Sequence, residues 1–302
     1  MKRYKFIIAD VFTDTPFGGN QLAVFTDRRG LSTEIMQKLA REMNYSETTF
    51  ILPPNSAGAD FHIRIFTPAI EIPFAGHPIV GTGYVIGATG MIKAAEPPSI
   101  LKLETGVGII SVQLQIENGA IGRVTMTQPN PVSRGAFDNY ADIADALGIS
   151  ASDIESGLPV EAIYNGLTVL IVPVSSLKAI ESIKVNLVKL ERVAQAVGAT
   201  TVLAFSQEVL NAASTVHCRV FAPGAGVMED PATGSANGPL GYYLVKHRLV
   251  KPEPTTKIIS EQGYEIFRPS TLYIEVDTSG DEITAVRVAG DVRIVGEGEM
   301  FV

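Results

Sequence analysis

The sequence repeats one pattern of residues in its two halves, and this duplication limits the folds that the chain can adopt. Four short segments recur in the same order at a nearly constant offset of 155 to 158 residues. They are Arg64-Ile-Phe-Thr-Pro68 with Arg219-Val-Phe-Ala-Pro223, Gly76-His77 with Gly234-Ser235, Gly83-Tyr84 with Gly241-Tyr242, and Glu104-Thr-Gly106 with Glu261-Gln-Gly263. Turn residues are common, but coincidence rarely keeps four matches in order at one spacing. We therefore interpret the chain as an internal duplication.

Each half is predicted to contain a strand, a proline turn, a buried helix opened by glycine, and a further strand. Residues 61–66 alternate between apolar and polar side chains, which is typical of a half-buried strand. Gly76-His77-Pro78 opens an apolar stretch that ends before a glycine-rich segment, which indicates a buried helix. A further helix is expected from a cap at Ser32 to about Met43. Other strands are expected at residues 4–9, 22–25, 48–52, 101–104 and 108–116.

The duplication predicts an α/β (α+β) protein of two similar domains, residues 1–130 and 131–302, with a boundary near Gln128-Pro-Asn-Pro131. A length of 302 residues suits two domains that each bury a core. A last strand is expected at about Val286–Val295. The sequence does not decide whether the segment of about 286–302 returns to the first domain. Each domain would offer the N-terminus of its glycine-opened helix to a shared cleft.

Composition and charge exclude several classes of protein. The net charge is −8 and no run of Lys or Arg forms a basic stripe, so nucleic acid is not an expected partner. The N-terminal residues have the pattern of a strand and not of a signal peptide. No apolar stretch approaches the roughly 20 residues that cross a bilayer. A single cysteine, Cys218, excludes an internal disulfide and fits a reducing compartment. We expect a cytoplasmic protein without a membrane segment.

The two glycine-opened helices are the strongest candidates for a binding site. The first N–H groups of a helix lack intrahelical partners and carry a partial positive charge, so they bind carboxylates and oxyanions. Gly76 and Gly234 mark the two helix starts. In the second half, small residues around Gly234 would let the backbone approach a ligand closely.

Four polar residues near these helix starts are candidates for catalysis or binding, although each also has a structural explanation. Glu47 lies between a predicted helix and strand, where carboxylates often serve as solvated caps. His77 and Ser235 directly follow the helix-opening glycines and could instead cap or pack. Asp230 could simply be a helix-entry residue, a role for which Asp is well suited. The residue types alone leave both interpretations open.

Longer motifs resemble those of the phenazine-biosynthesis (PhzF-like) isomerase family. The segment Ala40-Arg-Glu-Met-Asn-Tyr-Ser-Glu-Thr-Thr-Phe-Ile-Leu52 is similar to the segment of the family that carries a glutamate. Residues 64–78 resemble its histidine-bearing segment, and residues 226–236 resemble its loop with aspartate and serine. The opening Asp10-Val-Phe and Phe17-Gly-Gly-Asn20 also fit. These motifs follow the order of the family over almost the whole chain.

The resemblance implies the fold of diaminopimelate epimerase, with two similar domains in which a mixed, barrel-like sheet surrounds a central helix. Epimerases and proline racemases of that superfamily use two cysteines, which a chain with one cysteine cannot supply. We expect Cys218 to be a buried structural thiol. The resemblance assigns general acid–base catalysis to Glu47 and substrate binding to His77, Asp230 and Ser235. It also implies a homodimer.

In the phenazine enzymes that the chain resembles, trans-2,3-dihydro-3-hydroxyanthranilate is isomerised when a proton leaves C3 and returns at C1. One carboxylate suffices for such a shift, and partial burial would raise its pKa toward neutrality. No metal or other cofactor is expected, because no Cys/His cluster has ligand spacing and no nucleotide-binding motif follows a strand. Two alternatives stay open: an amino-acid-type epimerase that uses Glu47 and Asp230, and a non-catalytic protein that binds small acids.

Overall fold

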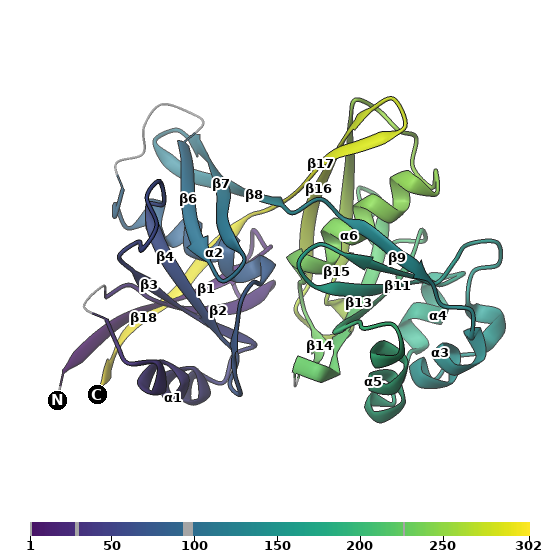
Figure 1. The fold of residues 1–302 in the computed structure, drawn as a ribbon, viewed down its shortest axis with the longest axis horizontal. Coiled ribbons are helices and arrows are strands. Elements are labelled where there is room, and N and C mark those ends of the chain that lie inside the picture. The colour runs from purple at the N-terminus through teal and green to yellow at the C-terminus, as the bar shows by residue number, and fades with distance from the viewer. Residues whose placement is uncertain (1, 28–29, 93–98, 226) are drawn as a thin grey trace. The chain divides into compact units, whose positions relative to one another are not determined.

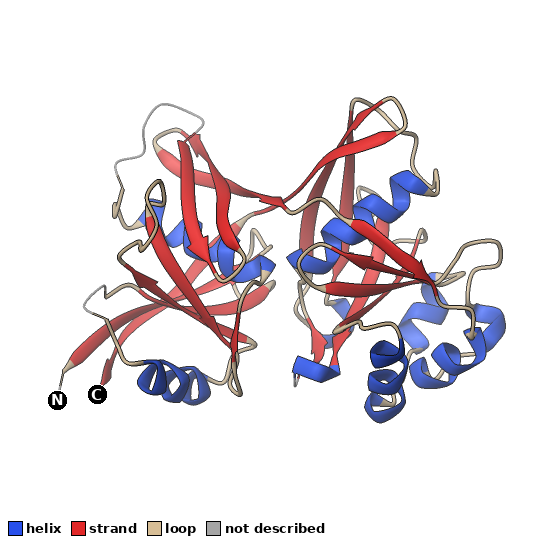
Figure 2. Ribbon diagram, viewed as in Figure 1, coloured by secondary structure: helices blue, strands red, loops and turns tan. Residues whose placement is uncertain are grey.

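The chain forms two compact units in the computed structural model, which describes residues 2–27, 30–92, 99–225 and 227–302. Unit 1 consists of Met1–Thr127 together with Ala289–Val302, and unit 2 consists of Gln128–Val288. Figure 1 follows the chain through both units from purple to yellow. Each unit combines strands with helices (Figure 2), as the α/β prediction requires.

Unit 1 contains the strands and helices predicted for the first half. Its helices are α1 (Thr33–Met43) and α2 (Gly76–Ala88). Its strands are β1 (Arg3–Val11), β2 (Asn20–Phe25), β3 (Glu47–Leu52), β4 (Phe61–Phe66), β5 (Glu71–Ile72), β6 (Ser99–Thr105), β7 (Gly108–Glu117), β8 (Ala120–Gln128, whose last residue lies in unit 2) and β18 (Val292–Phe301). Ser32 caps α1 as predicted, because its side chain accepts a hydrogen bond from the backbone of Ile35.

Strand pairing in unit 1 produces a mixed sheet. β1 pairs antiparallel with β2 and β18, and β2 runs parallel to β3. β4 pairs antiparallel with β3 and β5 and parallel with β6, which continues antiparallel to β7 and β8 through successive pairings. The central helix α2 contacts strands from several parts of this sheet. A Cβ at Gly81 would lie 2.6 Å from the side chain of Leu22, so glycine is needed for this close packing.

Unit 2 carries more helices than unit 1. Its helices are α3 (Tyr140–Leu147), η1 (Ala151–Asp153), α4 (Leu177–Ser182), α5 (Leu187–Ala196), η2 (Pro223–Ala225), α6 (Gly234–Lys246) and η3 (Tyr264–Ile266). Its strands are β9 (Val132–Ala136), β10 (Glu161–Tyr164), β11 (Thr168–Pro173), β12 (Thr201–Ser206), β13 (Val216–Ala222), β14 (Val227–Asp230), β15 (Thr255–Gln262), β16 (Ser270–Ser279) and β17 (Glu282–Gly290, which ends in unit 1). The buried helix α6 contacts strands β11, β12, β15 and β16.

The two units share their strand pairings, which confirms the duplicated fold. In unit 2, β10 to β16 pair with one another in the same orientations as β1 to β7 of unit 1. β9 pairs antiparallel with β10, as β18 does with β1. The strand that follows β8 therefore joins unit 2, and the strand that follows β17 joins unit 1.

The prediction of one strand at Val286–Val295 is wrong, because two strands meet within that range. β17 ends at Gly290 and β18 begins at Val292. Between them, the carbonyl of Asp291 accepts hydrogen bonds from the backbone of Phe12 and Thr13 at 2.8 and 3.1 Å. These bonds take the place of sheet pairing and interrupt the strand. The apolar pattern on both sides conceals this interruption in the sequence.

Candidate active site

In unit 1, Glu47 and His77 lie beside each other. Glu47 is the first residue of β3, where it pairs in register with Leu22 of β2. His77 is the second residue of α2, directly after Gly76. The two side chains are 14% and 3% exposed, and Glu47 Oε2 lies 3.5 Å from His77 Nε2. The start of a strand and the start of the central helix thus bring a carboxyl group and an imidazole together.

The imidazole of His77 is neutral over the physiological pH range. Burial lowers the pKa of His77 to about 3, and a hydrogen bond with the backbone of Gln21 only partly offsets this effect. Ring atom Nδ1 lies 3.1 Å from Asn20 Nδ2, while Nε2 is the ring atom nearest to Glu47. The contact with Glu47 is therefore made by an uncharged ring.

Asn20 is a site residue that the sequence pattern alone does not reveal. It is fully buried and begins β2, so its side chain reaches the ring of His77. The turn before it requires Gly19, which has a φ of +63° and where a Cβ would lie 2.3 Å from the carbonyl oxygen of Val11. The available signal was the position of Asn20 directly after two glycines.

In unit 2, Asp230 and Ser235 lie at the N-terminal end of α6. Asp230 is the last residue of β14, and Ser235 is the second residue of the helix that begins at Gly234. Each residue is 7% exposed. The hydroxyl of Thr233 donates a hydrogen bond of 2.5 Å to Asp230 Oδ2. Unit 2 therefore gathers its candidate residues at a helix start, as unit 1 does.

The N-termini of α2 and α6 have no side-chain caps. The capping positions are Ala75 and Thr233, and neither side chain makes a capping hydrogen bond. The first N–H groups of a helix have no partner within the helix and carry a partial positive charge. Both helix ends therefore have the electrostatics of a receptor for a carboxylate or an oxyanion.

Two buried amides orient the first turn of α6. Gln128 Nε2 donates to the carbonyl of Gly234 at 2.7 Å, and Asn165 Nδ2 donates to the carbonyl of Ser235 at 2.9 Å. A Cβ at Gly238 would lie 1.9 Å from Gln128 Oε1, so this approach requires glycine. Both amides are distant from the helix in sequence, and no local pattern indicates them.

Comparisons with known proteins identify the family. A family model described as phenazine biosynthesis-like protein matches residues 9–298. The chain belongs to this family. A trans-2,3-dihydro-3-hydroxyanthranilate isomerase of Pseudomonas chlororaphis is 36% identical to it over 295 residues, which cover 98% of each chain. The resemblance to the PhzF-like family is thereby confirmed, and the chain is an isomerase of that family.

Solved structures confirm the fold of this PhzF-family chain. A PhzF-family phenazine biosynthesis protein of Bacillus anthracis is similar with a TM-score of 0.90 and 28% identity, over 100% of both chains. A hydroxyproline epimerase of Agrobacterium vitis is similar with a TM-score of 0.67 and 13% identity, over 99% of this chain and 91% of that one. The second likeness shows the fold alone, which is the predicted diaminopimelate epimerase-like fold.

The two repeats of the PhzF-family chain do not carry their acid groups at equivalent positions. Glu47 begins β3, and its counterpart at the start of β12 is Thr201. Asp230 ends β14, and its counterpart at the end of β5 is Ile72. Each carboxyl group is therefore specific to one unit, and the duplication itself does not create a symmetrical pair of bases.

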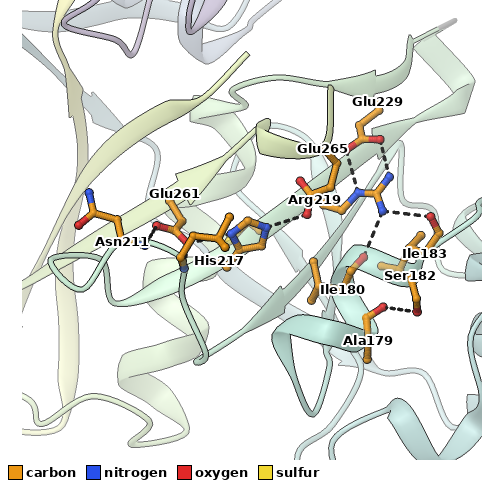
Figure 3. A network of polar contacts seen from close by, with 12 residues as sticks. Ala179, Ile180, Ser182, Ile183, Asn211, His217, Arg219, Glu229, Glu261 and Glu265 are labelled. Carbon is orange, nitrogen blue, oxygen red and sulfur yellow. Dashed lines mark hydrogen bonds and ion pairs between the residues drawn. The ribbon is translucent and has the colours of Figure 1, made fainter. Parts of the chain in front are cut away.

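Polar side chains on one face of β13 hold the segments next to the unit 2 site (Figure 3). His217 Nδ1 and Nε2 each lie 2.8 Å from a carboxylate oxygen, the first of Glu261 and the second of Glu265. Arg219 donates two hydrogen bonds to Glu229, at 2.9 and 2.7 Å. Glu229 directly precedes the last residue of β14, so this pair fixes the strand that carries Asp230.

The remaining sequence predictions concern the thiol, metals and membranes. Cys218 is fully buried, and burial raises the pKa of its thiol to about 12, which fits the predicted structural role. Within the described part of the chain, no three His, Cys, Asp or Glu side chains form a group that could hold a metal ion. None of the described helices has the length and apolar character needed to cross a bilayer.

Proposed function

We propose that this PhzF-family isomerase moves a proton within a small cyclic or unsaturated carboxylate, without metal or other cofactor. Trans-2,3-dihydro-3-hydroxyanthranilate is the proposed substrate. The observation that carries the proposal is the contact between a carboxyl group of low exposure, Glu47, and a neutral imidazole, His77, beside an uncapped helix start. The name of the Pseudomonas chlororaphis relative supports the choice of substrate.

In this proposal Glu47 is the general acid–base. Its carboxylate takes the proton from C3 of the substrate, and the electrons of that C–H bond form a double bond between C3 and C4. The conjugated double bonds each move by one position, and C1 receives the proton that Glu47 returns. The resulting enol then becomes the keto tautomer. Because the proton lost at C3 is replaced at C1, no oxidant or reductant is needed.

We assign binding of the substrate to the polar groups at the two helix starts. The proposed binding groups are His77 with the helix start at Gly76, and Asp230 and Ser235 with the helix start at Gly234. Helix N–H groups would hold the carboxylate of the substrate. His77, or Asp230 in its protonated form, would donate a hydrogen bond to the charge that develops during proton transfer.

The test is incubation of the purified protein with trans-2,3-dihydro-3-hydroxyanthranilate in D₂O, followed by ultraviolet absorbance and proton NMR. We expect the diene absorbance to disappear and deuterium to enter at C4 as the enol becomes the keto tautomer. C1 receives deuterium only when Glu47 exchanges its proton with solvent before returning it. Unchanged substrate would reject the phenazine substrate. Deuterium uptake with inversion at one stereocentre and unmoved double bonds would reject the proton shift and favour the epimerase that uses Glu47 and Asp230.

We also propose that the protein works in the cytoplasm as a homodimer, which the family resemblance supports. Light scattering of the purified protein after size-exclusion chromatography measures its molar mass directly. A mass near twice the 32.2 kDa of one chain is expected. A mass near that of one chain at micromolar concentration would contradict the homodimer.

A further inference from the structure

A short chain of hydrogen bonds connects the buried residue Gln262 to the carboxylate of Asp230. Gln262 ends β15 and is completely buried. Its Nε2 donates to the backbone carbonyl of Asp230 at 2.7 Å and to Thr233 Oγ1 at 3.1 Å. Thr233 Oγ1 in turn donates to Asp230 Oδ2 at 2.5 Å. The amide of Gln262 therefore holds the backbone of Asp230 directly and its side chain through Thr233.

The direction of each bond follows from groups that can play only one role. The backbone carbonyl of Asp230 only accepts, so the NH₂ group of Gln262 must face it. The backbone N–H of Thr233 only donates, and it lies 3.3 Å from Gln262 Oε1. The amide is thus oriented without ambiguity. Since its second N–H points to Thr233 Oγ1, the single hydroxyl proton of Thr233 is committed to Asp230 Oδ2.

The segment between β5 and α2 of unit 1 has the same backbone packing as the segment between β14 and α6 of unit 2, but it lacks the hydrogen-bonded side chains. The positions that match Asp230, Thr233 and Gln262 are occupied by Ile72, Ala75 and Thr105. The same close approach of glycine to proline nevertheless occurs in both units. A Cβ at Gly106 would lie 2.7 Å from Pro73 Cα, and a Cβ at Gly263 would lie 2.5 Å from the carbonyl oxygen of Pro231. The hydrogen-bonded side chains therefore occur in the unit that carries the carboxylate of Asp230, and the backbone packing does not require them.

We propose that Thr233 and Gln262 are positioning residues that hold the carboxyl group of Asp230 in one orientation toward a ligand. This inference rests on the proposed binding role of Asp230. The Thr233 hydroxyl donates to Oδ2, and the Gln262 amide holds both that hydroxyl and the backbone carbonyl of Asp230, so the carboxyl group cannot rotate without breaking a hydrogen bond. A carboxyl group held in one orientation presents its oxygens to a ligand in a defined geometry, and proton transfer depends on such alignment.

The hydrogen bond can be measured without substrate. In the full chain labelled with ¹³C at aspartate carboxyl carbons, replacement of the Thr233 hydroxyl proton by deuterium should shift the Asp230 signal, which Asp230→Asn identifies. We expect this isotope shift in wild type and in Thr233→Ser, but not in Thr233→Val. Gln262→Leu should lose it, because the hydroxyl is then free to rotate. Thr105→Val, at the matching position of unit 1, should keep it. An isotope shift that persists in Thr233→Val would overturn the proposal.

Kinetics in D₂O provide the second readout. Thr233→Val should lower kcat by about 10- to 100-fold, the size expected when a hydrogen bond to a charged group is lost. KM should change by less than about threefold, and Thr233→Ser should restore most of kcat. An unchanged kcat in Thr233→Val would overturn the positioning role. If wild type fails to turn over but keeps the isotope shift, the proposed function is rejected while the hydrogen bond that orients Asp230 is supported.

Discussion

The two units contain the same histidine–glutamate arrangement in different surroundings. In each unit a glutamate accepts hydrogen bonds from two consecutive backbone N–H groups of the loop between two strands. The donors are Asn55 and Ser56 for Glu104, at 2.7 and 3.2 Å, and Leu210 and Asn211 for Glu261, at 2.6 and 3.0 Å. In register with these glutamates, the neighbouring strands carry His62 and His217. Both units therefore fix the loop between these two strands through the same pair of backbone hydrogen bonds to a glutamate.

The difference between the units lies in the turn that follows the glutamate. In unit 1 two residues separate the paired Thr105 and Gly108, whereas in unit 2 seven residues separate the paired Gln262 and Ser270. The longer turn supplies Glu265, a second carboxylate for His217. The additional residues thus leave the buried ring of His217 with two carboxylate partners, whereas the ring of His62 is half-buried and contacts Asn55.

His77 and His217 show that a buried imidazole becomes a cation where its charge partners together outweigh the effect of burial on its pKa. Burial lowers the pKa of His217, but hydrogen bonds and charges of Glu261 and Glu265 outweigh this effect and raise it to about 9. His77 is also buried, yet its pKa falls to about 3. The nearest oxygen of Glu47 is 3.5 Å away, which is too far for a good hydrogen bond. Unit 2 therefore holds a structural cation, and unit 1 holds a neutral ring.

The largest expected effect on stability comes from removing the buried cation. His217→Ala leaves Glu261 and Glu265 without their partner, and breaking a buried ion pair in this way costs about 3–5 kcal/mol. The matched change in unit 1, His62→Ala, should cost less than about 1 kcal/mol, because that ring is partly exposed. Urea unfolding of both variants measures the free energies. Equal losses of unfolding free energy in the two variants would contradict a larger contribution of the buried ion pairs of His217 to stability.

An alkaline pH series sharpens the same comparison. The pKa of His217 is raised on folding to about 9, so its contribution to stability is complete below its unfolded value of about 6.5. That contribution is lost as the pH rises through about 9. The urea midpoint of wild type should therefore fall over this range, and that of His217→Ala should fall less. Parallel declines in the two proteins would contradict the assignment of a buried cation.

A mildly acidic pH series should reveal the opposite sign in unit 1, with a smaller effect. Folding lowers the pKa of His77 from about 6.5 to about 3, so stability is complete above the unfolded value. It is lost as the pH falls toward the folded value. Between about pH 6.5 and 5, before most carboxylates titrate, wild type should lose more thermal stability than His77→Asn. A larger loss in His77→Asn would contradict a neutral His77.

The fold was predictable because its main signals are local. The alternation at residues 61–66 and the glycine-opened apolar helices recur in both halves, and each forms the expected element. The exchange of β9 and β18 between the units was not predictable, since it depends on pairing between distant strands. The interruption at Asp291 escaped detection for the same reason, because its partners belong to the turn after β1.

The candidate site was predictable only in part. Glu47, His77, Asp230 and Ser235 lie within motifs, and the structure places each pair at the start of a central helix. The residues that orient them act across long separations in sequence. Gln262 reaches the carbonyl of a residue 32 positions away, and no periodic pattern reports such a contact.

The role of Glu47 as proton carrier is tested by comparing Glu47→Gln with Thr201→Val, its counterpart in the repeat. Isomerisation in D₂O would be followed together with calorimetric binding of anthranilate. We expect Glu47→Gln to lower kcat by about 10²–10⁴ while the Kd for anthranilate changes by less than about threefold. Thr201→Val should keep wild-type kcat. Turnover by Glu47→Gln close to that of wild type would contradict the assignment of Glu47 as the proton carrier.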